Sequence, residues 1–341
     1  MIKRREARVV KVGGIKIGGA EPVSIQSMTK VETSHISAVV SQIKRLKSSG
    51  CDIVRVAVKT VKDADAVRDI KRKTDIPIVC DIHFDHRLAL RCIANGADKI
   101  RLNPGNIKKS DDIVEIVRAA KERKIPIRIG VNSGSTSEDF VGSALKYVKI
   151  FEELDFRDII ISLKASDVIK TVEAYRKISG LCDYPLHLGV TASGPYDLGI
   201  VKSSIGIGAL LLDGIGDTIR VSLTADPVEE IRAAKRILSS LGLRNFGPQI
   251  LSCPTCGRCQ VDLVKIVNEL EMKLTTYSLK LKTGAPLTIA VMGCEVNGPG
   301  EAKEADIGIA FGKGSGMLFK KGKIVKKVSA KNAIKEIINN L

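Results

Sequence analysis

The sequence contains no tryptophan, and aromatic residues make up only 4% of its 341 residues. Proteins that bind single-stranded nucleic acid stack bases on aromatic side chains, so this scarcity argues against that class. No stretch approaches the ~20 consecutive apolar residues that cross a bilayer, so we expect no membrane partner. Residues 1–6 are mostly charged and lack the apolar core of a secretory signal. We therefore expect a cytoplasmic protein.

Acidic residues are few relative to basic ones: 38 Asp and Glu stand against 55 Lys and Arg, which gives a formal net charge of +17. A lysine-rich surface, a nucleic-acid partner and a polyanionic small substrate would each explain this excess. The scarcity of stacking platforms argues against a single-strand binder, and we expect no nucleic-acid partner; the lysine-rich surface and the anionic substrate both stay open at this point.

The eight cysteines are distributed unevenly. Four stand alone among apolar residues, where a small buried side chain is expected: Cys51, Cys80, Cys92 and Cys182. The other four gather toward the C-terminus: Cys253, Cys256, Cys259 and Cys294. In a reducing compartment such a group indicates metal or redox chemistry before disulfides.

Short β-branched runs alternate with amphipathic helical stretches from residue 23 to about residue 240. The pattern predicts eight strands, at residues 23–26, 53–57, 77–81, 99–102, 127–131, 159–163, 186–190 and 218–222. It predicts a helix after each strand, with Ser110 capping the fourth, and with Asp226 and Pro227 beginning the eighth. Eight such units match a (β/α)₈ barrel of the TIM type, with an open doubly wound sheet as the alternative.

The last hundred residues change character and predict a second, smaller domain. Apolar runs at 287–291 and 307–310 lie between glycine-rich turns, and a helix is expected from about residue 330 to the end. We expect an α/β barrel over residues 1–242 and a small α+β domain over residues 248–341.

Basic residues interrupt strands that should be apolar. Arginine occurs inside four of the predicted strands, and a lysine closes one more, the sixth along the chain. These residues are Arg55, Arg101, Arg128, Arg220 and Lys164. One or two such cases would be explained by ion pairs outside the barrel, since a lone buried arginine is costly. Five cases favour one cationic pocket at the C-terminal mouth, where barrel enzymes carry their chemistry. Arginine binds diphosphate oxygens bidentately, so we expect a phosphorylated substrate.

Polar residues follow the same strands. Asp81 and His83 end the third strand, and further polar groups end or follow later ones: Asn103, Asn132, Ser133, Thr191 and Ser222. Each alone is better explained as a loop-capping residue than as a catalytic group. His187 lies within an apolar strand, and we interpret it as a packing residue.

Cys253, Cys256 and Cys259 form a C-x₂-C-x₂-C motif, and Cys294 and Glu301 lie in a later glycine-rich segment. Thiolates at this spacing can converge on one metal centre. A structural zinc site tolerates such spacing. An iron–sulfur cluster is favoured by the three closely spaced thiols and by Pro254 directly after the first. The C-x₃-C-x₂-C pattern of radical adenosylmethionine enzymes is absent.

These segments give the chain a resemblance to the 4-hydroxy-3-methylbut-2-enyl diphosphate synthase family, iron–sulfur enzymes of the methylerythritol phosphate route to isoprenoids. The resemblance extends over nearly the whole chain, through the blocks at residues 27–29, 81–84, 101–106, 128–132, 214–218, 253–256 and 297–301. The length resembles that of the two-domain bacterial form.

The resemblance implies an oxidoreductase that opens the ring of 2-C-methyl-D-erythritol 2,4-cyclodiphosphate and removes a hydroxyl group, passing two electrons through a [4Fe-4S] cluster. It implies that the diphosphate is held by the strand residues Arg55, Arg101, Arg128, Lys164, Arg220 and Ser222, with Asn132 and Thr191 nearby. It also implies the cluster ligands Cys253, Cys256, Cys294 and Glu301, and a catalytic role for Glu301 and Asn297.

Ferredoxin or flavodoxin would supply the electrons, and a homodimer would join one chain's cluster to the other chain's barrel. This sequence departs from the family pattern at three places. Ala192 and Ser193 replace a Glu-Ala pair after the seventh strand, Cys259 is an additional cysteine, and Lys30-Val31-Glu32 replaces a polar run. The loss of the glutamate puts its acid–base role in question.

Two other function classes stay open at this stage. A zinc-bearing nucleic-acid module would use the charge and the cysteines, but it leaves the strand cations unexplained. A non-catalytic relative would keep the cluster without turnover, and Ala192 motivates that alternative.

Overall fold

The computed structural model describes residues 2–103, 106–107, 109–132, 139–277 and 287–341. The chain divides into two compact units, Met1–Arg244 and Asn245–Leu341. Each is described by itself.

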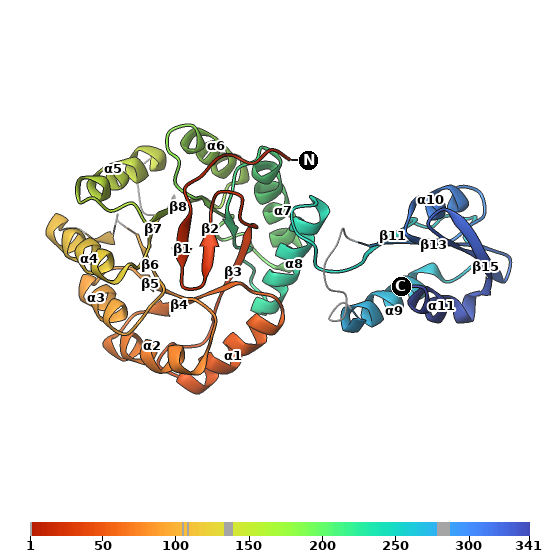
Figure 1. The fold of residues 1–341 in the computed structure, drawn as a ribbon, viewed down its shortest axis with the longest axis horizontal. Helices are drawn as coiled ribbons and strands as arrows, with labels where there is room; N and C mark the ends of the chain where they lie inside the picture. The colour runs from red at the N-terminus through yellow and green to blue at the C-terminus, as the bar shows by residue number, and fades with distance from the viewer. Residues whose placement is uncertain (1, 104–105, 108, 133–138, 278–286) are drawn as a thin grey trace. The chain divides into compact units, whose positions relative to one another are not determined.

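The first unit is a parallel barrel surrounded by helices (Figure 1). Its strands are β3 (Ser24–Met28), β4 (Ile53–Val58), β5 (Ile78–Ile82), β6 (Lys99–Leu102), β7 (Ile127–Asn132), β8 (Ile159–Lys164), β9 (His187–Leu188) and β10 (Thr218–Ile219). They pair in the order β8-β7-β6-β5-β4-β3-β10-β9, and a bridge between Ile161 and Leu186 joins β8 to the start of β9. The (β/α)₈ prediction is confirmed.

A helix follows each barrel strand. The helices are α1 (Ile36–Ser48), α2 (Val61–Lys73), α3 (His86–Ala94), α4 (Ser110–Arg123), α5 (Phe140–Glu153), α6 (Val168–Ser179), α7 (Tyr196–Leu212) and α8 (Pro227–Ser240). Asp226 caps α8 as expected, and its carboxylate accepts from the Val228 N–H at 2.9 Å. The predicted cap of α4 is wrong: Lys109 is the N-cap and Ser110 is the first helical residue.

Two predicted strands are shorter in the structure. β9 ends at Leu188 and β10 ends at Ile219, so Arg220 and Ser222 lie beyond a strand rather than inside one. Gly189 follows β9, and a Cβ atom on it would lie 2.5 Å from the carbonyl oxygen of Arg220. The two backbone segments approach each other too closely here for a side chain. This close approach explains why the residue at the end of the regular pairing is a glycine.

A hairpin that the sequence analysis did not predict closes one end of the barrel. Its strands β1 (Val10–Val12) and β2 (Ile15–Ile17) pair antiparallel and lie across the barrel in Figure 1. Val10, Val12 and Ile17 pack on residues near the starts of β4, β5 and β8, namely Ile53, Val79 and Ile160. The hairpin therefore covers the N-terminal end of the barrel.

The second unit is a mixed sheet with helices on both faces. Its elements are β11 (Gln249–Ser252), α9 (Leu263–Tyr277), β12 (Thr288–Met292), α10 (Gly298–Glu304), β13 (Ile307–Gly312), β14 (Ser315–Lys320), β15 (Lys323–Ser329), η2 (Ala330–Asn332) and α11 (Ala333–Asn339). The first three strands are parallel and the last two antiparallel. Leu270 of α9 and Ile337 of α11 pack on one face with Ile289 and Phe311, and Ala302 of α10 packs on the other.

Candidate active site

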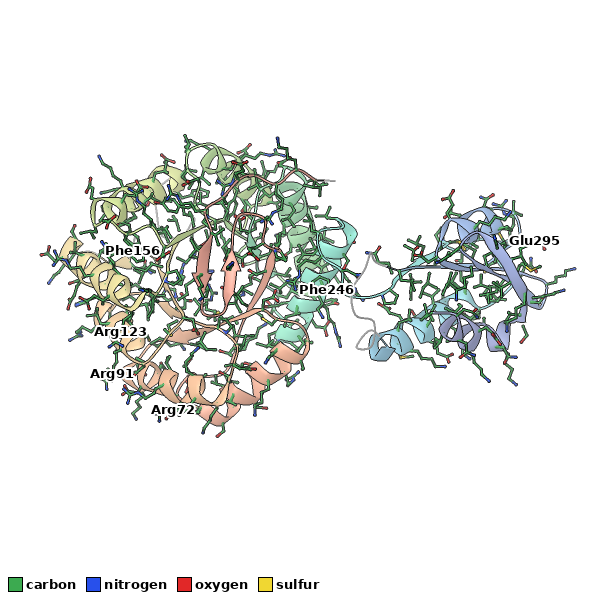
Figure 2. The ribbon with its side chains drawn as sticks, in the orientation of Figure 1. Arg72, Arg91, Arg123, Phe156, Phe246 and Glu295 are labelled. Atoms are coloured by element: carbon green, nitrogen blue, oxygen red, sulfur yellow. The ribbon has the colours of Figure 1, made fainter. Side chains whose placement is uncertain are left out.

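The five predicted strand cations come from different depths of the barrel: Arg55 and Arg128 lie in the first halves of β4 and β7, whereas Lys164 ends β8 and Arg220 follows β10. Arg101 and Arg128 face each other in register on β6 and β7, and Lys164 ends β8 opposite Asn132. Arg128 is 1% exposed, Arg101 4% and Lys164 8%, whereas the side chains of Arg55 and Arg220 are 13% exposed. Arginines on the outer helices differ: Arg72, Arg91 and Arg123 lie on the periphery of the barrel in Figure 2. The fold therefore brings the predicted cations into one cluster, in which Arg55 and Arg101 lie close enough to act on the charge of Arg128.

Two buried carboxylates lie among these cations. Asp81 of β5 accepts from Arg101 Nη1 at 3.0 Å, and its other oxygen is 3.7 Å from Arg55 Nε. Glu230 of α8 lies 3.7 Å from Arg220 Nε and 3.4 Å from Lys30 Nζ. The Ser27 hydroxyl and the Leu223 N–H also donate to Glu230, at 3.1 Å each. Among the residues that the structure describes, no further carboxylate pairs with the remaining cations of this cluster.

This imbalance shows in the proton affinities of the cluster. Burial, followed by repulsion from Arg55 and Arg101, lowers the pKa of Arg128 well below its ordinary value. Burial and the neighbouring arginines likewise lower the pKa of Lys164, and that of Arg220 falls to about 10. Although burial opposes it, the charge of Arg55, a hydrogen bond with His83 and the charge of Arg101 hold the pKa of Asp81 far below its usual range. Such a site favours binding of an anion.

Two glycines make room for the cations. A Cβ atom on Gly130 of β7 would lie 2.5 Å from Arg101 Nε, and one on Gly189 would lie 2.7 Å from Lys164 Nζ. Both positions therefore require a residue without a side chain. Nε and Nη1 of Arg128 are buried and have no hydrogen-bond partner among the described residues, so these donors could bind a ligand.

The smaller polar residues of the predicted site also end at this mouth. Asn132 is the last residue of β7, and the Thr191 N–H donates to the Ala165 carbonyl at 3.0 Å. Ser222 accepts at its carbonyl from the Ser193 hydroxyl. Ser133 lies outside the described residues. Ala192 has a positive φ of 47° and is exposed.

Sequence reasoning missed three charged residues of this region: Glu230, Lys30 and Lys99. Lys99 begins β6, is fully buried and has no partner for Nζ among the described residues. Lys99 is a basic residue at the start of a predicted strand, so the sequence pattern could have identified it. Glu230 carried none, because an acidic residue in the first turn of a helix is ordinary.

His187 is only half satisfied in the barrel interior. Its ring is fully buried, with Nδ1 3.3 Å from the Thr218 hydroxyl and, within the described ranges of the chain, no partner for Nε2. Burial and the charges of Lys164 and Arg128 lower its pKa well below the ordinary value, so the ring is neutral. It packs, as expected, but it also lines the polar interior.

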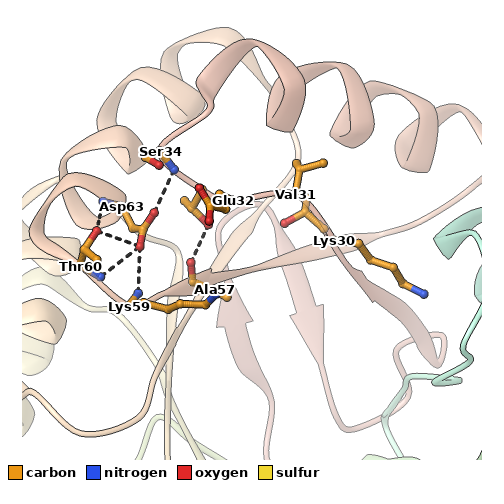
Figure 3. A pocket seen from close by; sticks show the side chains of 10 residues that line it. Lys30, Val31, Glu32, Ser34, Ala57, Lys59, Thr60 and Asp63 are labelled. Carbon is orange, nitrogen blue, oxygen red and sulfur yellow. Dashed lines mark hydrogen bonds between the residues drawn. The ribbon is translucent and has the colours of Figure 1, made fainter.

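A cavity of about 210 Å³ lies between the loops after β3 and β4 (Figure 3). Asp63 lines it but is occupied: its carboxylate accepts from the N–H groups of Ser34, Lys59 and Thr60 and from the Thr60 hydroxyl, at 2.9 to 3.1 Å. This carboxylate holds two loops together and is not free to act in chemistry.

In the second unit, the parallel pairing of β11 and β12 brings two predicted ligands to one sheet end. Cys253 follows β11 directly, and Cys294 follows β12 by two residues. The N–H of Gly293 donates to Cys253 Sγ at 3.4 Å. Hydrogen bonds from the N–H groups of Val296, Asn297 and Gly298 lower the pKa of Cys294. These donors favour thiolates, the form in which cysteine binds iron.

The other residues of the predicted ligand set are more loosely placed. Glu301 lies in the first turn of α10, after its N-cap Asn297, and is exposed, as is Cys256. Cys259 is partly buried, and its thiol donates to the Val261 carbonyl at 3.2 Å. Within the described part of the chain, no three His, Cys, Asp or Glu side chains are gathered closely enough to hold a metal. The thiol-rich donor set nevertheless fits an iron–sulfur cluster in its chemistry.

Fold and site together define a (β/α)₈ barrel with a buried cluster of cations, followed along the chain by a cysteine-bearing unit. Residues 7–235 match the GcpE TIM-barrel domain and residues 249–341 match the GcpE protein C-terminal domain. The chain belongs to the GcpE family. It is 53% identical to a protein of Fusobacterium nucleatum over 98% of this chain and 96% of that one. It is 53% identical to one of Clostridium perfringens over 99% and 98%. Both are named 4-hydroxy-3-methylbut-2-en-1-yl diphosphate synthase (flavodoxin).

Solved structures support the barrel alone. Dihydropteroate synthase from Stenotrophomonas maltophilia matches with a TM-score of 0.54 and 13% identity, over 70% of this chain and 100% of that chain. A truncated 3-deoxy-D-arabino-heptulosonate 7-phosphate synthase from Thermotoga maritima matches with a TM-score of 0.52 and 15% identity, over 69% and 94%. Among the helices that the structure describes, none has the length and apolarity needed to span a membrane.

Proposed function

We propose that this chain catalyses the reaction for which its relatives are named, the formation of 4-hydroxy-3-methylbut-2-enyl diphosphate. The substrate would be 2-C-methyl-D-erythritol 2,4-cyclodiphosphate, whose ring is opened and dehydroxylated by two electrons. The observation that carries this proposal is the excess of buried cations over carboxylates among the described residues of the barrel interior. A cyclic diphosphate would supply the missing negative charge.

In this proposal the diphosphate is held by Arg55, Arg101, Arg128, Lys164, Arg220 and Ser222, with Asn132 and Thr191 nearby. The guanidinium groups would bind phosphate oxygens bidentately, and the buried setting would strengthen each bond. The fixed ion pairs of Asp81 with Arg101 and Arg55 keep two of these cations oriented before the substrate arrives.

Cys253, Cys256, Cys294 and Glu301 would hold a [4Fe-4S] cluster, which when bound delivers electrons to the substrate. The backbone donors around Cys294 support its role as a thiolate ligand. A carboxylate binds iron of a sulfide cluster less firmly than a thiolate, so Glu301 would be the ligand able to leave. Asn297, the N-cap of α10, would contact the substrate.

The electron donor would be flavodoxin, as in the names of the relatives, with ferredoxin as the alternative.

We further propose a homodimer in which one chain's cysteine-bearing unit covers the barrel of its partner. Mixing a Cys294→Ser variant with an Arg128→Met variant tests this: recovered activity supports a shared site, and an active monomer at assay concentration contradicts it. A reducing cytoplasm would keep the thiols free.

An anaerobic assay tests the function directly. Purified holoenzyme, reduced flavodoxin and the cyclic diphosphate should yield one product molecule per two electrons, and iron analysis should find four irons per chain. A colourless protein with one bound zinc and no turnover would contradict the proposal.

A further inference from the structure

The proposed reaction needs a proton as well as electrons. Two electrons from the reduced donor break the bond between C2 and the phosphate oxygen, which stays on the diphosphate as an anion. The electron pair left at C2 forms the C2=C3 double bond and expels the C3 hydroxyl group. One proton converts that hydroxide to water, so an acid must lie near C3.

The carboxylates among the cations are poorly suited to supply this proton. Asp81 is held as an anion by Arg55 and Arg101. Glu230 is occupied by Ser27, Lys30, Arg220 and the Leu223 N–H. In the loop after β9, Thr191 is followed by Ala192, which has no acidic group.

His83 lies beside the same cations with part of its ring open. It follows β5 by one residue, and its side chain is 46% exposed. Nε2 lies 3.5 Å from Asp81 Oδ2 and 3.5 Å from Arg101 Nη1, while Nδ1 lies 3.5 Å from Asn106 Nδ2. Asp81 thus fixes one edge of the ring. The same edge lies beside Arg101, one of the cations assigned to the diphosphate.

We propose that His83 is the general acid that protonates the departing C3 hydroxyl group, an inference that rests on the proposed function. In the imidazolium form, Nε2–H donates to Asp81 and Nδ1–H donates to the leaving oxygen. After transfer, the neutral ring keeps Nε2–H on Asp81, and the Asn106 amide donates to the bare Nδ1. The charged groups that face the ring are Asp81 beside it on β5, Arg101 on β6 and, through Asp81, Arg55 on β4.

The assignment gives His83 a role in turnover rather than in substrate affinity. The His83→Gln variant keeps a polar side chain but cannot deliver a proton near neutral pH. We expect its calorimetric affinity for the cyclic diphosphate, measured on oxidised holoenzyme, to stay within about threefold of wild type. Its single-turnover rate should fall by roughly 10²- to 10⁴-fold, the usual contribution of a general acid.

Two further readouts separate an acid from a structural residue. The alkaline decline of kcat with pH should flatten in His83→Gln, and added imidazole should restore part of the rate to His83→Ala. His35→Gln is the matched control, because His35 is also exposed, at 69%, and pairs with Glu32. It should behave as wild type in each measurement.

A turnover rate of His83→Gln within threefold of wild type would overturn the proposal. So would a loss of affinity with unchanged kcat, which would make His83 a substrate ligand only. If wild-type enzyme with reduced flavodoxin neither binds nor converts the cyclic diphosphate, the proposed function itself fails and this inference fails with it.

Discussion

Arg101 lies directly against Gly130 on the neighbouring strand: a Cβ atom on residue 130 would come within 2.5 Å of Arg101 Nε. Arg101 also donates through Nη2 to the Gly130 carbonyl at 3.1 Å, and through Nη1 to Asp81 at 3.0 Å. Two hydrogen bonds, one to β5 and one to β7, therefore hold the guanidinium. It can take this position only because residue 130 has no side chain.

Gly130→Ala should displace Arg101, because the guanidinium is buried and cannot move freely into solvent. We expect substrate affinity to fall by roughly tenfold or more, the equivalent of about 1.4 kcal/mol, as judged by calorimetry. Gly208→Ala is the control, since a Cβ atom there would meet nothing within 4 Å, and its helical position favours alanine. Equal affinity of Gly130→Ala and wild type would show that the arginine does not bind substrate.

Lys99 should make the stability of the protein depend on pH. Burial, then repulsion from Arg128 and Arg55, lowers the pKa of this amine well below its ordinary value of 10.5. Between the lowered native value and 10.5 the unfolded chain binds more protons than the native one, so stability rises with pH in that window.

Lys99→Met removes this linkage. The variant should be more stable than wild type at pH 7, by roughly 1–4 kcal/mol on the scale of buried charges replaced by apolar groups. The difference should shrink as the pH approaches 10. Thermal unfolding of the two proteins at pH 7 and pH 9.5 measures it, with exposed Lys44→Met as control. A variant less stable than wild type at pH 7 would show that Lys99 is paired in solution.

The ligand set can be tested on the cysteine-bearing unit. Cys259 donates to the Val261 carbonyl and packs beside the unit's apolar core, as a structural thiol does. Cys259→Ser should therefore keep both iron content and activity, whereas Glu301→Ala should lose turnover and hold its cluster weakly. Iron analysis and visible absorption report the cluster. Loss of iron from Cys259→Ser together with full activity of Glu301→Ala would reverse the assignment.

Much of the barrel and its cluster of buried cations could be predicted from the sequence, because each strand and each charged residue within a strand is visible locally. A charged residue in an apolar strand, such as Arg101 or Arg128, is conspicuous without any knowledge of the fold. The early ends of β9 and β10, which leave Arg220 outside a strand, were not predicted. They occur where Gly189 approaches the backbone of Arg220, and these residues are far apart in the sequence. Glu230 was missed because its partners, Lys30, Arg220 and Ser27, come next to α8 only in the folded barrel. The β1–β2 hairpin was missed because three-residue strands give little periodicity.

The central claim is that the buried cations of the barrel bind a cyclic diphosphate. Calorimetric titration of wild type and Arg128→Met with 2-C-methyl-D-erythritol 2,4-cyclodiphosphate tests it most directly, with exposed Arg123→Met as control. The account predicts that Arg128→Met weakens binding by about 10- to 1,000-fold, since charge-assisted bonds in a dry site are strong. It also predicts that the substrate-free variant is no less stable than wild type, because a buried cation without its own carboxylate is removed. Binding of the cyclic diphosphate by Arg128→Met within threefold of wild type would contradict the account.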